Sequence, residues 1–152
     1  MNRWMKIAYD EAVIGMLADE GGPFGAVILK DGEVIAKAHN RVLVSNDPTA
    51  HAEVNAIREA SRVLGTHDLS GTTLYTSCEP CPMCLGAIFW ARISTIYYGA
   101  SKEDAAKGGF DDAKFYDMLS GKRDGIKFER LDAKESAKLF DLWNQKGDAQ
   151  IY

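Results

Sequence analysis

Two short stretches of the sequence carry residues whose types and spacing suit metal chemistry. One is His51-Ala52-Glu53, and the other is Pro80-Cys81-Pro82-Met83-Cys84. Zinc prefers nitrogen and thiolate ligands in a tetrahedron, and a catalytic zinc keeps three protein ligands so that its fourth position stays open for water. His51, Cys81 and Cys84 supply that number. We therefore predict one Zn²⁺ per subunit, held by these three side chains.

The spacing within each stretch leads to different expectations. Cys81 and Cys84 are three residues apart, which places them roughly 60° apart on a helix, close enough to share one ion. In a first helical turn, free N–H groups and the helix dipole also favour thiolates. His51 and Glu53 are two apart and would face opposite sides of a regular helix, so their spacing alone does not define a geometry. We assign Glu53 as the catalytic proton carrier between a zinc-activated water and a leaving group.

A third cysteine, Cys78, leaves a non-enzymatic alternative open. A structural zinc site takes four protein ligands, and Cys78 would be the fourth. An iron–sulfur site is disfavoured because the chain has only three cysteines. The alternatives are therefore a catalytic centre and a zinc-stabilised binding module without turnover, and the role of Cys78 is undefined.

The elements that must position these residues follow from hydrophobic periodicity and turn chemistry. Alternating strands and helices predict an α/β fold, a three-layer α/β/α sandwich around a five-stranded mixed sheet. Asp31-Gly32 predicts a tight hairpin turn, and Asp47 followed by Pro48 predicts a helix start. Residues 99–110 are expected to form a loop. Helices are expected over residues 5–16, 48–65, 80–90, 112–119 and 134–146, and strands over 25–30, 33–38, 72–77, 93–98 and 127–131.

Composition limits the function classes. The 152 residues fit one domain, 1–152, and the net charge of −4 disfavours nucleic acid, whose binders usually carry a basic surplus. No run of about 18 apolar residues is present, which argues against a membrane span. The first twenty residues do not have the pattern of a signal peptide. We expect a cytoplasmic protein that acts on a small molecule.

The two chemical stretches resemble those of a known superfamily. A His-x-Glu pair with Pro-Cys-x-x-Cys is the pattern of zinc deaminases, and the chain is similar to the cytidine-deaminase-like superfamily. Within it, the sequence resembles the bacterial guanine deaminases, through Gly109-Phe110-Asp111-Asp112 above all. Further similarity lies at residues 22–27, 45–53, 76–88 and 90–92. The resemblance implies hydrolytic deamination of guanine to xanthine and ammonia.

The same resemblance implies roles for residues outside the metal site. Asn40 and Asp112 would hydrogen-bond the edge of the purine, and Phe24 would stack on the ring. The backbone N–H of Ala52 would help to orient the substrate. Considered without the resemblance, Asn40 is equally well a loop asparagine and Asp112 equally well a helix N-cap.

The resemblance also implies a homodimer. In that family the C-terminal segment, here 133–152, is exchanged between subunits, so that Tyr152 would close the active site of the neighbour. Taken alone, Tyr152 is a terminal residue of the kind that is usually poorly ordered.

Other substrates fit the same zinc chemistry. A tRNA deaminase acting on a wobble adenosine shares the zinc pattern, and so does a deaminase of cytosine or of another amino-heterocycle. The acidic balance and the Phe-Asp-Asp stretch favour the free nucleobase guanine.

Overall fold

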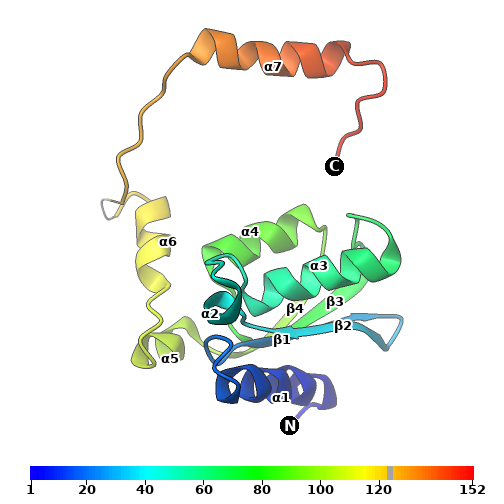
Figure 1. Ribbon diagram of the computed structural model, residues 1–152, viewed down its shortest axis with the longest axis vertical. Coiled ribbons are helices and arrows are strands. Elements are labelled where there is room, and N and C mark those ends of the chain that lie inside the picture. Colours follow the sequence, from blue (N-terminus) through cyan, green and yellow to red (C-terminus); the bar gives the residue numbers. More distant parts are fainter. Residues whose placement is uncertain (123–124) are drawn as a thin grey trace.

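A mixed sheet forms the centre of the computed structural model, which describes residues 1–122 and 125–152. Within this part of the chain the sheet has four strands in the order β2-β1-β3-β4 (Figure 1). Strand β1 runs antiparallel to both β2 and β3, whereas β3 and β4 are parallel. The strands are β1 (Gly25–Lys30), β2 (Glu33–His39), β3 (Thr72–Cys78) and β4 (Thr95–Ala100).

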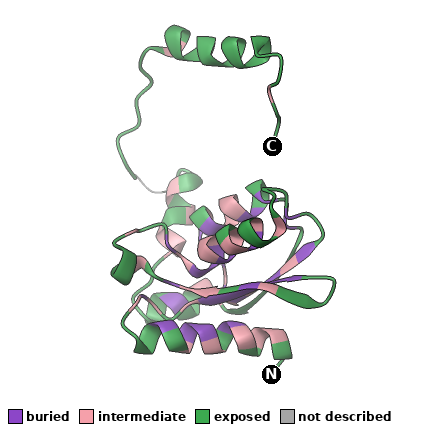
Figure 2. Cartoon of the chain, turned by 45° about the vertical axis from the view of Figure 1, so that its right-hand side comes forward, coloured by how far each residue is buried: buried purple, intermediate pink, exposed green. Residues whose placement is uncertain are grey.

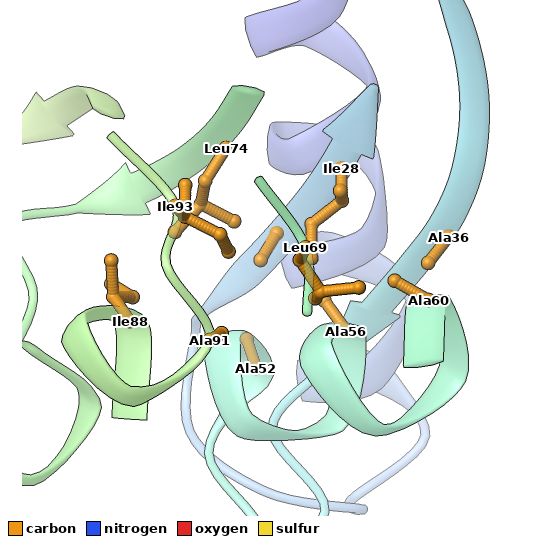
Figure 3. Packing of buried hydrophobic residues seen from close by; sticks show 11 residues of the cluster. Ile28, Ala36, Ala52, Ala56, Ala60, Leu69, Leu74, Ile88, Ala91 and Ile93 are labelled. Atoms are coloured by element: carbon orange, nitrogen blue, oxygen red, sulfur yellow. The ribbon is translucent and has the colours of Figure 1, made fainter. Parts of the chain in front are cut away.

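Helices cover both faces of this sheet. Helix α1 (Arg3–Leu17) lies on one face, and α3 (Ala52–Leu64) and α4 (Pro82–Trp90) lie on the other (Figure 1). Figure 3 shows Ile28 and Leu74 reaching from the sheet toward α3 and α4, where they join the larger apolar core. The predicted three-layer α/β/α sandwich is confirmed.

The hairpin that begins the sheet follows its turn chemistry. Asp31 and Gly32 have φ angles of 51° and 77°, both left-handed, as the primed turn of a two-residue hairpin requires. The strands on either side carry the predicted residues, with β2 one residue longer than expected. The turn residues therefore define where β1 and β2 pair.

The predicted fifth strand over residues 127–131 is wrong. Within the described ranges this stretch belongs to no strand and connects α6 (Ala113–Leu119) to α7 (Ala133–Gln145). Its side chains face solvent, and Phe128 is 94% exposed. Apolar residues at strand-like spacing stabilise a strand only when a neighbour pairs with it, and no described strand pairs with this stretch.

Two other local predictions are corrected. The helix expected from Pro48 begins at Ala52, because the Asp47 carboxylate accepts hydrogen bonds from the Thr49 backbone N–H (2.8 Å) and hydroxyl (2.6 Å). The Asp47 carboxylate is therefore engaged within this turn and does not cap a helix that starts at Pro48. The expected loop over 99–110 contains a short helix, α5 (Lys102–Lys107), which begins at a capping box of Ser101.

The C-terminal helix stands apart from the sandwich. Figures 1 and 2 show α7 away from the sheet and its covering helices, with its surface almost wholly exposed. Short helix α2 (Val42–Ser45) lies beside the start of α3. No helix among the described residues is long and apolar enough to cross a membrane.

Candidate active site

Three predicted ligands converge at the starts of two helices. His51 is the N-cap of α3, Cys81 is the N-cap of α4, and Cys84 lies in the first turn of α4. The Nδ1 atom of His51 is 3.6 Å from Sγ of Cys81 and 3.5 Å from Sγ of Cys84. Zinc bonds of about 2.0 Å to nitrogen and about 2.3 Å to sulfur, at tetrahedral angles, separate such atoms by about 3.5 Å. The donor set therefore fits zinc.

The conformation of His51 explains how a two-residue spacing serves one site. Its backbone is extended (φ −71°, ψ 156°), and its side chain does not cap the helix. Glu53 lies two residues later, inside the helix. The opposite-face rule applies only to two residues that are both helical, so the imidazole and the carboxylate can share one centre.

Glu53 is a buried carboxyl group with two polar contacts. Its Oε1 accepts a hydrogen bond from the Thr76 hydroxyl at 3.1 Å, and its Oε2 accepts one from the Cys84 thiol at 3.3 Å. Glu53 is only 5% exposed, and this burial raises the pKa of its carboxyl group. A raised pKa suits a group that must accept a proton and release it again.

The pKa values of the two cysteine ligands are shifted in opposite directions. The pKa of the Cys81 thiol is lowered, because hydrogen bonding with Cys84, and to a lesser extent with His51, favours its thiolate. The same pairing with Cys81, together with burial, raises the pKa of Cys84. Since zinc binds thiolates, metal binding here must displace the Cys84 proton.

Cys78 lies outside the ligand group. Its Sγ donates a hydrogen bond to the Ser101 carbonyl oxygen at 3.8 Å, and burial raises the pKa of its thiol to about 11. Among the described residues, the clustered donor atoms are those of His51, Cys81 and Cys84. Three protein ligands define an open catalytic site and argue against the four-ligand structural alternative.

A cavity of about 460 Å³ opens onto the metal ligands and Glu53. Asn40 lies in its wall, is 5% exposed, and accepts a hydrogen bond from the Val42 N–H through Oδ1 at 3.0 Å. The wall beneath Asn40 is tight, because a Cβ atom on Gly21 would lie 2.1 Å from that Oδ1. The lining residues are Gly21, Gly22, Phe24, Asn40, Val42, Leu43, Pro48, His51, Glu53, Glu79, Cys81, Phe110 and Asp112.

Asp112 is positioned for the cavity and not for capping. It directly precedes α6, but its side chain makes no cap hydrogen bond, and it lines the cavity. Burial raises the pKa of its carboxyl group, and the nearby Cys81 raises it further. Phe24 lines the cavity, and its ring meets Phe110 edge-to-face, with centroids 4.9 Å apart and planes at 88°.

Sequence reasoning overlooked Thr76 and Phe110. The two-residue period of a strand could have indicated that Thr76 lies on the same inward face as Leu74, as the structure shows. Phe110 stands in the quoted Phe-Asp-Asp stretch, but its pairing with Phe24 depends on the path of the chain around α5. The contacts of Thr76 with Glu53 and of Phe110 with Phe24 join segments that are far apart in the sequence, so local spacing does not predict them.

Two remaining predicted residues differ in placement. Ala52 is fully buried at the start of α3, where helix N–H groups lack helical acceptors. Tyr152 does not line the cavity of its own chain. Its ring centroid lies 5.9 Å from that of Trp90 and 6.0 Å from that of His67. A single chain therefore assembles the predicted site without its terminal tyrosine.

Comparison with known proteins supports a deaminase centre. Residues 1–100, which include all three ligands and Glu53, match the family described as the cytidine and deoxycytidylate deaminase zinc-binding region. The chain belongs to this family. Its family membership makes zinc the expected metal of the three-ligand group.

Within the deaminase family, similarity extends over the full chain for one relative. Guanine deaminase of Bacillus subtilis is 48% identical over 151 residues, covering 98% of this chain and 97% of that protein. The crystal structure of a Bacillus subtilis guanine deaminase superposes with a TM-score of 0.92 at 47% identity, covering 100% of this chain and 99% of that one. A tRNA-specific adenosine deaminase of Buchnera aphidicola is 43% identical over 70% of each chain.

Proposed function

We propose that the protein hydrolyses guanine to xanthine and ammonia. The observation that carries this proposal is the composition of the cavity wall. An amide from Asn40, a carboxylate from Asp112 and an aromatic ring from Phe24 face the same space as the metal ligands and Glu53. Similarity along the whole chain to a guanine deaminase supports the same substrate.

Recognition of guanine follows from hydrogen-bonding capacity. An ionised carboxylate only accepts hydrogen bonds, whereas an asparagine amide both donates and accepts. Guanine presents ring N–H and amino donors beside C2, and it presents a carbonyl oxygen at C6. We assign Asp112 to the donors and Asn40 to a mixed donor and acceptor edge, with Phe24 against the ring and the Ala52 N–H as a further donor. Adenine lacks the ring N–H at this edge, so Asp112 favours guanine.

Proton transfer is assigned to Glu53. His51, Cys81 and Cys84 would hold zinc, which when bound would lower the pKa of a water molecule and so supply a hydroxide nucleophile at neutral pH. Glu53 takes the proton released by that water onto its carboxylate and delivers it to the amino group of guanine. A C–O bond forms at C2 and the C–N bond breaks, so that ammonia leaves. Burial of Glu53 supports the role, because its raised pKa lowers the cost of holding the proton between the two transfers.

Activity on a substrate panel tests the proposal. Zinc-loaded protein should release ammonia from guanine, and chelation of the metal should abolish the release. The panel also contains adenine, cytosine, the corresponding nucleosides and tRNA. Inosine formation in tRNA without turnover of guanine would assign the chain to wobble adenosine deamination, and preferential turnover of cytosine would assign it to another amino-heterocycle. Either result would overturn the proposal.

We propose further that the protein is a homodimer with exchanged C-terminal segments. Residues 133–152 form a helix and tail whose apolar side chains are exposed in the single chain, including Leu139 and Phe140 at 65% and 71%. A second groove of about 880 Å³ adjoins the site and is bordered by His51, Cys81 and Asp112. The tail of a second copy is the proposed occupant.

A cytoplasmic location is also proposed, because the cysteine ligands must remain reduced.

A further inference from the structure

Asp112 belongs to a part of the chain that lies outside the sandwich. Helices α5 and α6 sit beside the sheet edge, and neither covers one of its faces (Figure 1). Asp112 stands between them, with no hydrogen bond from its own side chain to the start of α6. Its distance from the metal ligands therefore depends on whichever contacts attach these two helices to the sandwich.

The dipeptide before the first cysteine ligand supplies two such contacts. The Glu79 carboxylate accepts a hydrogen bond from the Lys102 backbone N–H at 3.0 Å, which attaches the start of α5. The carbonyl oxygen of Pro80 accepts a hydrogen bond from the hydroxyl of Tyr116 at 2.7 Å, which attaches α6. Both helices are thus anchored to the residues that immediately precede Cys81.

Of these two hydrogen bonds, the one from Tyr116 connects Asp112 to a metal ligand through fewer residues. Tyr116 follows Asp112 by four residues, so both lie on the same side of the first turn of α6. Pro80 is buried and is bonded directly to Cys81. The Tyr116 ring is half-buried, and the Lys102 ammonium group lies 5.3 Å from its centroid. One hydroxyl–carbonyl hydrogen bond therefore links the helix that carries the substrate carboxylate to the loop that carries a metal ligand.

We propose that Tyr116 is a positioning residue that sets the Asp112 carboxylate at its distance from the metal centre and thereby determines affinity for guanine. This inference rests on the proposed function, because it assigns Asp112 to the substrate. Without the hydroxyl, α6 loses its hydrogen bond to the residue before Cys81 and is held less firmly there, so the carboxylate makes a weaker contact with the ring N–H and amino groups. The metal ligands and Glu53 belong to the sandwich and keep their places.

The Tyr116→Phe variant tests the proposal because it removes only the hydroxyl. We expect KM for guanine to rise about fivefold, the effect of losing roughly one ordinary hydrogen bond, with kcat close to that of the unmodified protein. Zinc content and thermal unfolding temperature should show a folded, metal-loaded variant. Tyr98→Phe is the matched control, since Tyr98 is 53% exposed on β4 and lies outside the cavity wall; its KM should not change.

A double-mutant cycle separates positioning from general support. If Tyr116 acts through Asp112, then Tyr116→Phe should add little to the KM of Asp112→Asn, whereas independent effects would multiply. An unchanged KM in Tyr116→Phe, a lower kcat at constant KM, or multiplying effects would each overturn the inference while leaving guanine turnover intact. Failure of the zinc-loaded unmodified protein to turn over guanine would instead overturn the proposed function, and this inference with it.

Discussion

The metal centre depends on residues that stand at the boundary of a helix. His51 and Cys81 are both N-caps, with extended backbones and no side-chain cap bond. An N-cap side chain is released from helical periodicity, while the free N–H groups behind it favour negative charge. This placement lets α3 contribute an imidazole and a carboxylate from neighbouring positions to one centre.

The Glu53→Gln variant should separate catalysis from structure. Glutamine keeps the shape of the side chain but cannot accept and release a proton, so we expect kcat to fall at least ~100-fold, the usual scale for a general acid–base residue. Zinc content measured by metal analysis should remain about one per chain, because Glu53 is not assigned as a ligand. Guanine turnover is measured by ammonia release.

Glu33→Gln provides the matched control, since Glu33 is exposed at the hairpin and lies outside the cavity. It should be as active as the unmodified protein. A Glu53→Gln protein that retains full activity would remove Glu53 from the mechanism, and a protein inactive with or without the substitution would favour the zinc-stabilised binding module.

The role of a residue could be predicted from the sequence where its type of side chain has one common function. Two cysteines and a histidine indicated zinc by count, and the structure brings their donor atoms within 4.8 Å of one another. The roles of Asn40 and Asp112 needed a family resemblance, because an asparagine in a loop and an aspartate before a helix each have common structural explanations. Their proximity arises from chain segments 72 residues apart, which no local pattern encodes.

At the scale of elements, local turn chemistry was the reliable guide. The Asp31-Gly32 turn predicted the hairpin, and Gly65 ends α3 with a left-handed φ of 66°, as expected for a glycine cap. The start of α3 was misplaced because Asp47 uses its carboxylate within its own turn. Residues 127–131 were misassigned because a strand depends on a neighbouring strand that the sequence of the segment does not specify.

A charged cluster joins α1, β2 and the loop between α1 and β1, and it should make stability depend on pH. His39 contacts Glu11 through Nδ1 at 3.0 Å and Glu20 through Nε2 at 2.6 Å, while Lys37 and Arg41 contact the same two carboxylates. Burial alone would lower the pKa of His39, but the two carboxylates raise it above its ordinary value of 6.5. The protonated imidazole therefore stabilises the fold.

This stabilisation should be complete below about pH 6.5 and should be lost as the pH rises through the higher pKa of folded His39. The measurement is the free energy of unfolding of zinc-loaded protein against pH, compared with His39→Gln. The difference between the two proteins should shrink toward high pH. His67→Gln, at an exposed position, serves as control. A difference that is constant with pH, or that grows at high pH, would contradict the assignment.

At the scale of the whole molecule, the catalytic sandwich and the C-terminal segment behave as separate parts. The main apolar core lies between the sheet and helices α3 and α4, and α7 contributes no buried residue. An exposed helix with apolar side chains is expected to bury them against another surface. The proposed exchange between subunits would supply that surface.

Complementation between two impaired variants, measured at a guanine concentration well below KM, should test the exchange. One variant is Glu53→Gln with an intact tail, and the other lacks Tyr152 but keeps Glu53. If the tail of one subunit completes the site of the other, their co-expression should restore about a quarter of full activity, because half of the dimers are mixed and each mixed dimer has one working site. The deletion variant alone should show a raised KM.

Absence of any recovery in mixed dimers verified by mass would contradict the exchange, and so would full activity of the protein without Tyr152. A monomeric protein with normal guanine turnover would contradict both the dimer and the role assigned to the tail.

The tight wall at Gly21 has an evolutionary consequence. Every non-glycine substitution there places a carbon atom against the Asn40 side chain, so position 21 cannot be changed by a single mutation without displacing Asn40. Leu43, on α2, also lines the cavity, is 65% exposed and has room to vary. Descendants of this protein that acquire a larger or smaller substrate should therefore carry their changes at α2, while the glycine persists.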